Sequence, residues 1–149
     1  VNVPNGTNNK LWLYVNGVQI GTMDSSVKNG VMYDCYSKGT VQSGDAVGGL
    51  VGEGKGSFRS CRFDGTVSGT GPSGGIVGSG TNAGLEFYDC HTTGSVSGGA
   101  YVGGIVGHGY PDMYNCSVEA EEGSYIHSNY WCCGGIIGYA VTDGTEIRY

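Results

Sequence analysis

The sequence predicts an all-β fold, a parallel β-solenoid (β-helix) of about four glycine-rich rungs with an N-terminal hairpin or cap. The first observation is a glycine phrase that occurs four times, at Val47–Gly52, Gly74–Gly78, Val102–Gly107 and Gly134–Gly138. The second is a cysteine ahead of each phrase, at Cys35, Cys61, Cys90 and Cys116, with intervals of 26, 29 and 26 residues. Because cysteine and phrase recur together, each repeat is one unit that stacks on copies of itself.

Further columns define the strands of each rung. Three residues before each cysteine comes a large apolar side chain, at Met32, Phe58, Phe87 and Met113. Six residues after the first three cysteines comes a valine between polar neighbours, at Val41, Val67 and Val96. Such triplets turn one side chain inward, and glycine or Asx residues beside them suit corners. We therefore expect about three short strands per rung. A β-propeller would need longer repeats.

The two ends and the fourth repeat depart from this pattern. Leu11–Ile20 is typical of a hairpin around Asn16-Gly17 or of an irregular first rung, so residues 1–30 are expected to be a cap or a donor segment and 31–149 the solenoid. In the fourth repeat Glu122 takes the valine position, and Gly134 follows its cysteine by 18 rather than 13 residues. Ile147 returns to the Met32 column, which indicates either a further rung or a closing strand.

The glycine phrases, with the preceding Asx-Cys and Gly-Thr-Val elements, resemble the GLUG-motif repeat of large bacterial surface and secreted proteins. The resemblance covers about residues 31–138. It implies a surface-displayed repeat region, often associated with adhesion or with secreted peptidases whose catalytic domains lie elsewhere. No catalytic residue belongs to the motif, so the resemblance implies none here.

Composition favours an extracellular or cell-surface domain. The 149 residues include 31 glycines, and only 13% are charged, which is unusual for a cytosolic enzyme. A net charge of −6 with seven basic residues argues against nucleic acid as a partner. No apolar run is long enough to span a membrane. The expected partners are copies of the chain or flanking repeats of a longer chain, and cell-surface glycans or proteins.

The cysteine column is expected to be a ladder of buried thiols, at Cys35, Cys61, Cys90 and Cys116. Four sulfurs spread over three rung steps cannot converge on one metal ion. In-register stacking also holds Cβ atoms farther apart than a disulfide prefers, although one strained disulfide stays an alternative. Cys133 aligns with Val102 and is expected to face inward, which leaves Cys132 exposed.

The irregular fourth repeat supplies the candidate contact residues. Their aromatic rings and carboxylates suit sugar or protein binding; they are Glu119, Glu121, Glu122, Tyr125, His127, Tyr130 and Trp131. A bulged turn that covers the open rung is the structural alternative, and a calcium site from the three glutamates is a third. A second surface feature is the column Tyr33, Arg59, Tyr88, Tyr114 and Arg148, expected to form a stripe with cation–π contacts.

Nothing in the sequence indicates catalysis, a cofactor or a metal. His91, His108 and His127 fall at unrelated register positions, with no recurring nucleophile or carboxylate pair. Sequons at Asn5 and Asn115 are possible glycosylation sites. We expect a non-enzymatic structural or adhesive module, and a candidate filament subunit that assembles through solenoid ends or the N-terminal segment. The alternative is a carbohydrate-binding adhesin module centred on the insertion of the fourth repeat, residues 119–131. Ice binding by the Thr40/Gln42, Thr66/Ser68 and Ser95/Ser97 rows is a third alternative.

Overall fold

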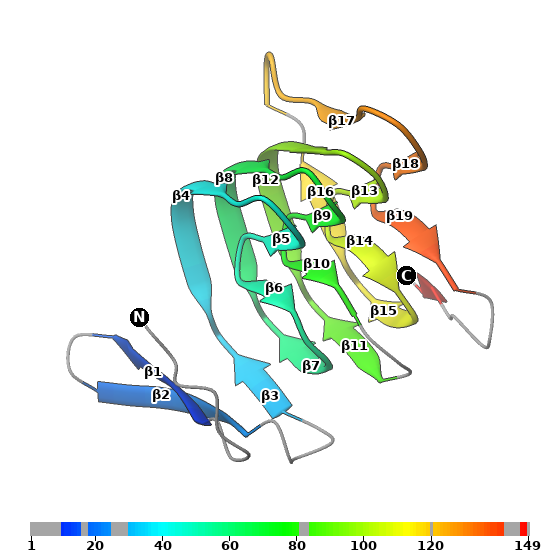
Figure 1. Cartoon of the computed structure of the whole chain (residues 1–149). Coiled ribbons are helices and arrows are strands. Elements are labelled where there is room, and N and C mark those ends of the chain that lie inside the picture. Colours follow the sequence, from blue (N-terminus) through cyan, green and yellow to red (C-terminus); the bar gives the residue numbers. More distant parts are fainter. Residues whose placement is uncertain are drawn as a thin grey trace.

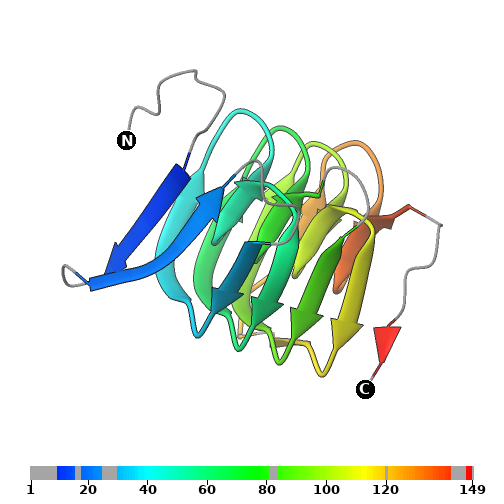
Figure 2. The same ribbon diagram turned by 90° about the horizontal axis from the view of Figure 1, so that it is seen from below.

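The chain folds as a parallel β-solenoid with no helix in the described part, as predicted (Figure 1). The structure, a computed structural model, describes residues 10–15, 18–24, 30–80, 84–119, 121–141 and 147–148. Four stacked rungs run along one axis, and Figure 2 shows equivalent strands side by side. The described part of the chain holds no helix that could cross a membrane.

Each rung contributes strands to four parallel sheets. Sheet 1 contains β3 (Gly30–Tyr33), β7 (Gly56–Arg59), β11 (Leu85–Tyr88), β15 (Pro111–Tyr114) and β20 (Ile147–Arg148). Sheet 2 contains β4 (Tyr36–Gln42), β8 (Arg62–Ser68), β12 (His91–Gly98), β16 (Ser117–Glu119) and β17 (Ile126–Ser128). Sheet 3 contains β5 (Val47–Gly48), β9 (Ser73–Gly74), β13 (Val102–Gly103) and β18 (Cys133–Gly134). Sheet 4 contains β6 (Val51–Glu53), β10 (Val77–Ser79), β14 (Val106–Gly109) and β19 (Ile137–Ala140).

The expectation of three strands per rung was wrong, because the glycine phrase holds two strands rather than one. In the second rung β9 ends at Gly74, the chain bends through Gly75 and Ile76, and β10 begins at Val77. A Cβ atom on Gly74 would collide with the carbonyl oxygen of Val77. The glycines therefore allow the two arms of the bend to approach backbone to backbone.

The corner between sheets 1 and 2 explains the residue before each cysteine. Asp34, Ser60, Asp89 and Asn115 have φ angles of 51°, 52°, 52° and 51°, in the left-handed region. Short polar side chains tolerate this conformation better than bulky ones, since they can bond the local backbone. In each rung the chain turns at this corner so that the following cysteine faces inward.

The core lies between the four sheets and follows the predicted columns. Met32, Phe58, Phe87 and Met113 pair in register in sheet 1, and the rings of Phe58 and Phe87 stack with centroids 4.9 Å apart. Val41, Val67 and Val96 pair in register in sheet 2. Phe87, Val67 and Ile105 are fully buried. Middle rungs are thus covered on both sides, whereas the inward residues of the first and fourth rungs are mostly half-buried.

The N-terminal hairpin consists of β1 (Lys10–Val15) and β2 (Val18–Asp24), which pair antiparallel. This confirms the predicted hairpin, while Asn16-Gly17 lies outside the described residues. The hairpin is a sheet of its own beside the first rung in Figures 1 and 2. Among the described residues it pairs with no strand of the solenoid, so its role as a cap or donor stays a prediction.

Candidate functional site

The cysteine ladder occupies the inner side of the corner between sheets 1 and 2. Cys35, Cys61 and Cys90 are buried, Cys116 is half-buried, and all four are free thiols. Each thiol donates to the carbonyl oxygen two residues earlier, for example Cys90 Sγ to Tyr88 O at 3.4 Å. Cys90 also donates to Phe58 O of the previous rung at 3.4 Å. The ladder thus links consecutive rungs through the interior.

Neighbouring thiols shift one another's ionisation. Hydrogen bonds with Cys116 and Cys61, together with burial, raise the pKa of Cys90. The hydrogen bond with Cys90 lowers the pKa of Cys61 to about 7. Burial raises the pKa of Cys35. Access to solvent, more than pKa, should decide reactivity here, because Cys61 and Cys90 are fully buried.

The insertion of the fourth repeat is split between two places. In the third rung only Gly94 and Ser95 separate Thr93 from Val96, whereas six residues separate their partners Glu119 and Ile126 in the fourth repeat. One further residue is added between Ser128 and Cys133. Ile126, not Glu122, pairs with Val96. The assignment of Glu122 to the valine column was therefore wrong, since the bulge shifts the register by four residues.

The seven predicted contact residues do not form one site. Glu119, Glu121, Glu122, Tyr125, His127, Tyr130 and Trp131 are all exposed. Glu121 belongs to a tight turn in which its carbonyl accepts from Ser124 N and Oγ, at 2.9 and 2.8 Å. His127 Nε2 lies 3.2 Å from Asn129 Oδ1. Only Trp131 has a ring contact with another rung. A joint carboxylate and aromatic surface is therefore not supported by these contacts.

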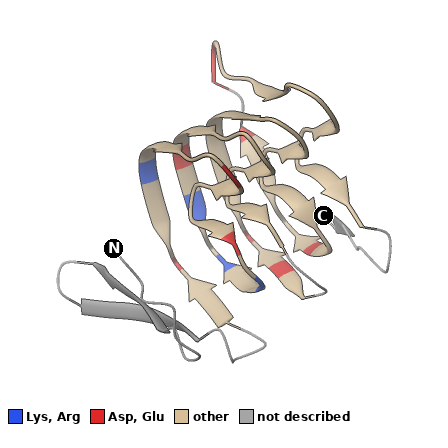
Figure 3. Ribbon diagram, in the orientation of Figure 1, with Lys and Arg blue, Asp and Glu red and all other residues tan. Residues whose placement is uncertain are grey.

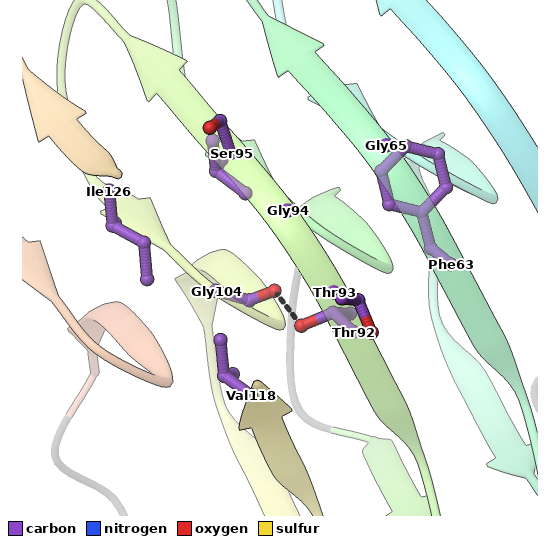
Figure 4. A pocket seen from close by; sticks show the side chains of 10 residues that line it. Phe63, Gly65, Thr92, Thr93, Gly94, Ser95, Gly104, Val118 and Ile126 are labelled. Carbon is purple, nitrogen blue, oxygen red and sulfur yellow. Dashed lines mark hydrogen bonds between the residues drawn. The ribbon is translucent and has the colours of Figure 1, made fainter. Parts of the chain in front are cut away.

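The bulge leaves a seam inside the solenoid (Figure 4). The seam lies between Gly94 and Ser95 of β12 and the apolar side chains of Val118 and Ile126. Thr92 Oγ1, beside it, donates to Gly104 O at 2.8 Å. The seam has no room for a water molecule. It is a packing defect rather than a ligand pocket.

The fourth rung is open on the side facing away from the third. Val118, Ile126, Ile136 and Ile137 are half-buried. At the positions equivalent to Ile136 and Ile137, the middle rungs have fully buried side chains, namely Ile76, Ile105, Val77 and Val106. Backbone amides of the third rung donate to the fourth, as in Ile105 N to Ile136 O at 2.9 Å. Among the described residues no rung accepts from the amides of Gly135 and Ile136. Unpaired edges of this kind are templates for further strands.

Cys133 shows the effect of this open side. It pairs in register with Val102, as predicted. Its side chain is nevertheless exposed, like that of Cys132, because no described strand covers β18. The expectation that Cys132 alone is exposed was therefore wrong. Among the described residues the pair offers two accessible thiols at the open rung.

An aromatic cluster, Tyr101, His108, Trp131 and Tyr139, joins the third and fourth rungs beside sheets 3 and 4. Tyr101 is central, with ring centroids 5.0 Å from Tyr139, 5.2 Å from His108 and 5.9 Å from Trp131. The rings of His108 and Tyr139 are stacked, with centroids 5.6 Å apart and planes within 4°. Sequence reasoning had included only Trp131. The proximity of His108 and Tyr139 could have been predicted from their register, because each follows the second glycine of its phrase by four residues.

The predicted stripe on sheet 1 is present in register. Tyr33, Arg59, Tyr88, Tyr114 and Arg148 pair along the five strands. The Arg59 guanidinium carbon lies 4.6 Å from the centre of the Tyr88 ring, and Tyr88 stacks on Tyr114 with centroids 4.8 Å apart. Contacts thus join Arg59, Tyr88 and Tyr114 in the middle of the stripe. This favours reinforcement of the sheet over a free binding platform.

Charged residues are scattered along the described ribbon without a continuous row of Lys or Arg (Figure 3). On sheet 2, Arg62 Nε donates to Asp64 Oδ1 at 2.8 Å, and Tyr36 Oη donates to Asp64 Oδ2 at 2.9 Å. The bond from Arg62 lowers the pKa of Asp64, and the bond to Asp64 raises the pKa of Tyr36. This exposed network bridges the first two rungs.

Within the described residues no three His, Cys, Asp or Glu side chains are placed to hold a metal ion.

The two predicted glycosylation sites and the hydroxyl rows complete the set. Asn115 is exposed, and its Nδ2, the atom that glycosylation would modify, donates to Asp89 Oδ1 at 2.6 Å. Asn5 lies outside the described residues. The hydroxyl rows pair in register, but Ser95 Oγ accepts from Tyr125 N at 3.1 Å, so the rows are already bonded in part.

Comparisons with protein-family models, curated proteins and solved structures found no match for this chain. The resemblance to the GLUG-motif repeat therefore stays a prediction from the repeated motif.

Proposed function

We propose that this chain is a non-enzymatic structural module, displayed outside the cell, whose open fourth rung accepts a further rung of the same register. The observation that carries the proposal is the contrast between middle and terminal rungs. Ile105 is fully buried and its amide is bonded, whereas Ile136 one rung later is half-buried. A further rung would bury these apolar side chains and satisfy the exposed backbone edge.

The energetics of repeat folds support this role. Each rung gains stability mainly from its neighbours, so a terminal rung is the least stable part until another covers it. Burying apolar surface contributes about 25 cal/mol per Å², and Val118, Ile126, Ile136 and Ile137 all have surface left to bury. Extension at this end is therefore favourable.

The start of a fifth rung supports the same direction of growth. β20 pairs with β15, and Ile147 takes the place next to Met113 in the core column. Among the described residues, sheets 2, 3 and 4 have no strand from a fifth rung. The covering rung would come from flanking repeats of a longer chain or from a second copy. A second copy would add head to tail, which generates an open filament.

The surface location and lack of catalysis are further parts of the proposal. Low charge, abundant glycine and the resemblance to surface repeats support an extracellular position. The contacts of the three histidines support a structural role. His91 Nδ1 lies 2.8 Å from Ser117 Oγ, His127 contacts Asn129, and His108 stacks on Tyr139. Protease shaving of intact source cells should release the module if it is displayed.

Sedimentation velocity over a concentration series tests self-association. If a second copy covers the open rung, larger species should appear with concentration, and negative-stain images should show linear particles. Ile136→Lys should abolish them, because an inward charge blocks strand addition. Val31→Lys is the matched control, since Val31 is exposed on sheet 1. A wild-type chain that stays monomeric throughout rejects the second copy and leaves flanking repeats as the source.

A further inference from the structure

We propose that the aromatic cluster Tyr101, His108, Trp131 and Tyr139 is a platform that binds the apolar face of a neutral pyranose sugar. This inference is independent of rung addition at the open end. Two of the four rings are largely exposed, with Trp131 at 65% and Tyr139 at 42%. Tyr101 and His108 are half-buried and fix the positions of the outer rings.

The backbone at Tyr101 is the first argument for a functional cluster. Its φ angle is 53°, in the left-handed region that bulky residues rarely adopt. The other described non-glycine residues with positive φ are the short polar residues of the cysteine corner. Pro72 and Cys132, which precede the equivalent strands, are not among them. Strain of this kind concentrates at functional sites, and here it places the Tyr101 ring among the other three.

The spacing of the rings indicates the shape of the ligand. Centroids 5.0 to 5.9 Å apart leave no space for a cation between the rings, so the cluster is not an aromatic cage for a quaternary ammonium group. The rings of Trp131 and Tyr139 are exposed to solvent instead. A ligand must lie against these rings, as a sugar ring does when its axial C–H groups face an aromatic plane.

The chemistry of the cluster favours a neutral sugar. The cluster contains no carboxylate and no Lys or Arg side chain. Tyrosine hydroxyls and ring N–H groups at the edges can bond sugar hydroxyls while the ring faces stack. A β-linked glucan presents flat faces of axial hydrogens on every residue, so cellohexaose is a suitable probe.

Saturation-transfer NMR with the full chain and cellohexaose tests the proposal. Transfer should be strongest to the axial H1, H3 and H5 protons, with saturable binding below about 10 mM, since small ligands on open platforms bind weakly. Trp131→Ala and Tyr101→Asn should each weaken binding about tenfold or more. Asparagine tolerates the left-handed backbone, so Tyr101→Asn removes the ring without adding strain. Tyr33→Ala, an exposed tyrosine outside the cluster, should bind like wild type.

Melting temperatures identify variants that fold. If Trp131→Ala or Tyr101→Asn does not fold, Tyr139→Ala carries the test, because its ring lies at the exposed edge. Three results would each overturn the proposal. They are no transfer to cellohexaose at about 10 mM, unchanged affinity in every folded cluster variant, and stronger binding of choline than of cellohexaose.

Discussion

Gly75 donates its backbone amide to the carbonyl oxygen of Gly104 in the next rung, at 3.1 Å, and a Cβ atom on Gly75 would overlap that same oxygen. The relationship recurs along the solenoid. A Cβ on Gly49 would overlap Gly75 O, and one on Gly104 would overlap Gly135 O. The repeated glycine therefore allows each rung to approach the next. The reason is close approach and not a left-handed backbone, since Gly75 has no positive φ.

A matched pair of alanine substitutions tests this interpretation. Gly75→Ala should destabilise the fold by several kcal/mol, because backbone atoms must shift. Gly135→Ala should be neutral or slightly stabilising, since a Cβ there meets nothing within 4 Å and alanine restricts the unfolded chain. Denaturant unfolding of both variants checks this difference. Equal stabilities would show that rung spacing does not depend on the glycine column.

Charges in the core columns should prevent folding. Val67→Asp or Ile105→Asp would place a carboxylate among fully buried apolar side chains, at a cost of several kcal/mol. Val31→Asp is the control, because Val31 is 53% exposed. Circular dichroism during heating measures the effect. Retention of the wild-type β signal and melting temperature by Val67→Asp would contradict the observed register.

Thiol reactivity should follow exposure. A thiol reagent under native conditions should modify Cys132 and Cys133 quickly and Cys116 slowly, because these are exposed and half-buried, respectively. Cys35, Cys61 and Cys90 should react only after denaturation, even though the pKa of Cys61 is about 7. Mass spectrometry of labelled peptides assigns each site. Fast native labelling of Cys61 would show that the ladder opens in solution.

The Asp64 network predicts a pH dependence of known sign. The hydrogen bond from Arg62 lowers the pKa of Asp64 in the folded state, so its contribution to stability is complete above the unfolded value of about 3.9 and is lost as pH falls below it. The effect should be small, because Arg62 is half exposed. NMR titration of the folded protein should give an Asp64 pKa below this unfolded value. Arg62→Gln should move the midpoint up, and an unchanged midpoint would contradict the pairing.

Most of the fold could be predicted because its columns repeat. Cys35, Cys61, Cys90 and Cys116 marked the register, and polar neighbours marked Val67 and Val96 as inward. The prediction failed where the repeat changes length. Glu122 was aligned with the valine column because counting from Cys116 does not show where an insertion bulges, whereas the structure pairs Ile126 with Val96.

The aromatic cluster was harder to foresee. Tyr101 and His108 belong to one rung, and Trp131 and Tyr139 to the next, on the far side of the insertion. Two register shifts separate them in sequence, so their proximity follows only from the three-dimensional stacking. The exposure of Cys133 was missed for a related reason. Its column predicts an inward direction, but burial also requires a neighbouring rung.

The most direct test of the open rung is to cover it. Residues 61–79, the part of the second rung that follows the corner at Ser60, can be appended after Tyr149, because Ile147 and Arg148 occupy the register positions of Phe58 and Arg59. The added rung should raise the melting temperature by about 5 °C or more. It should also protect Cys133 from a thiol reagent, whereas a scrambled segment of the same composition should do neither. An unchanged melting temperature together with Cys133 labelling at the wild-type rate would contradict the proposal that the fourth rung accepts another.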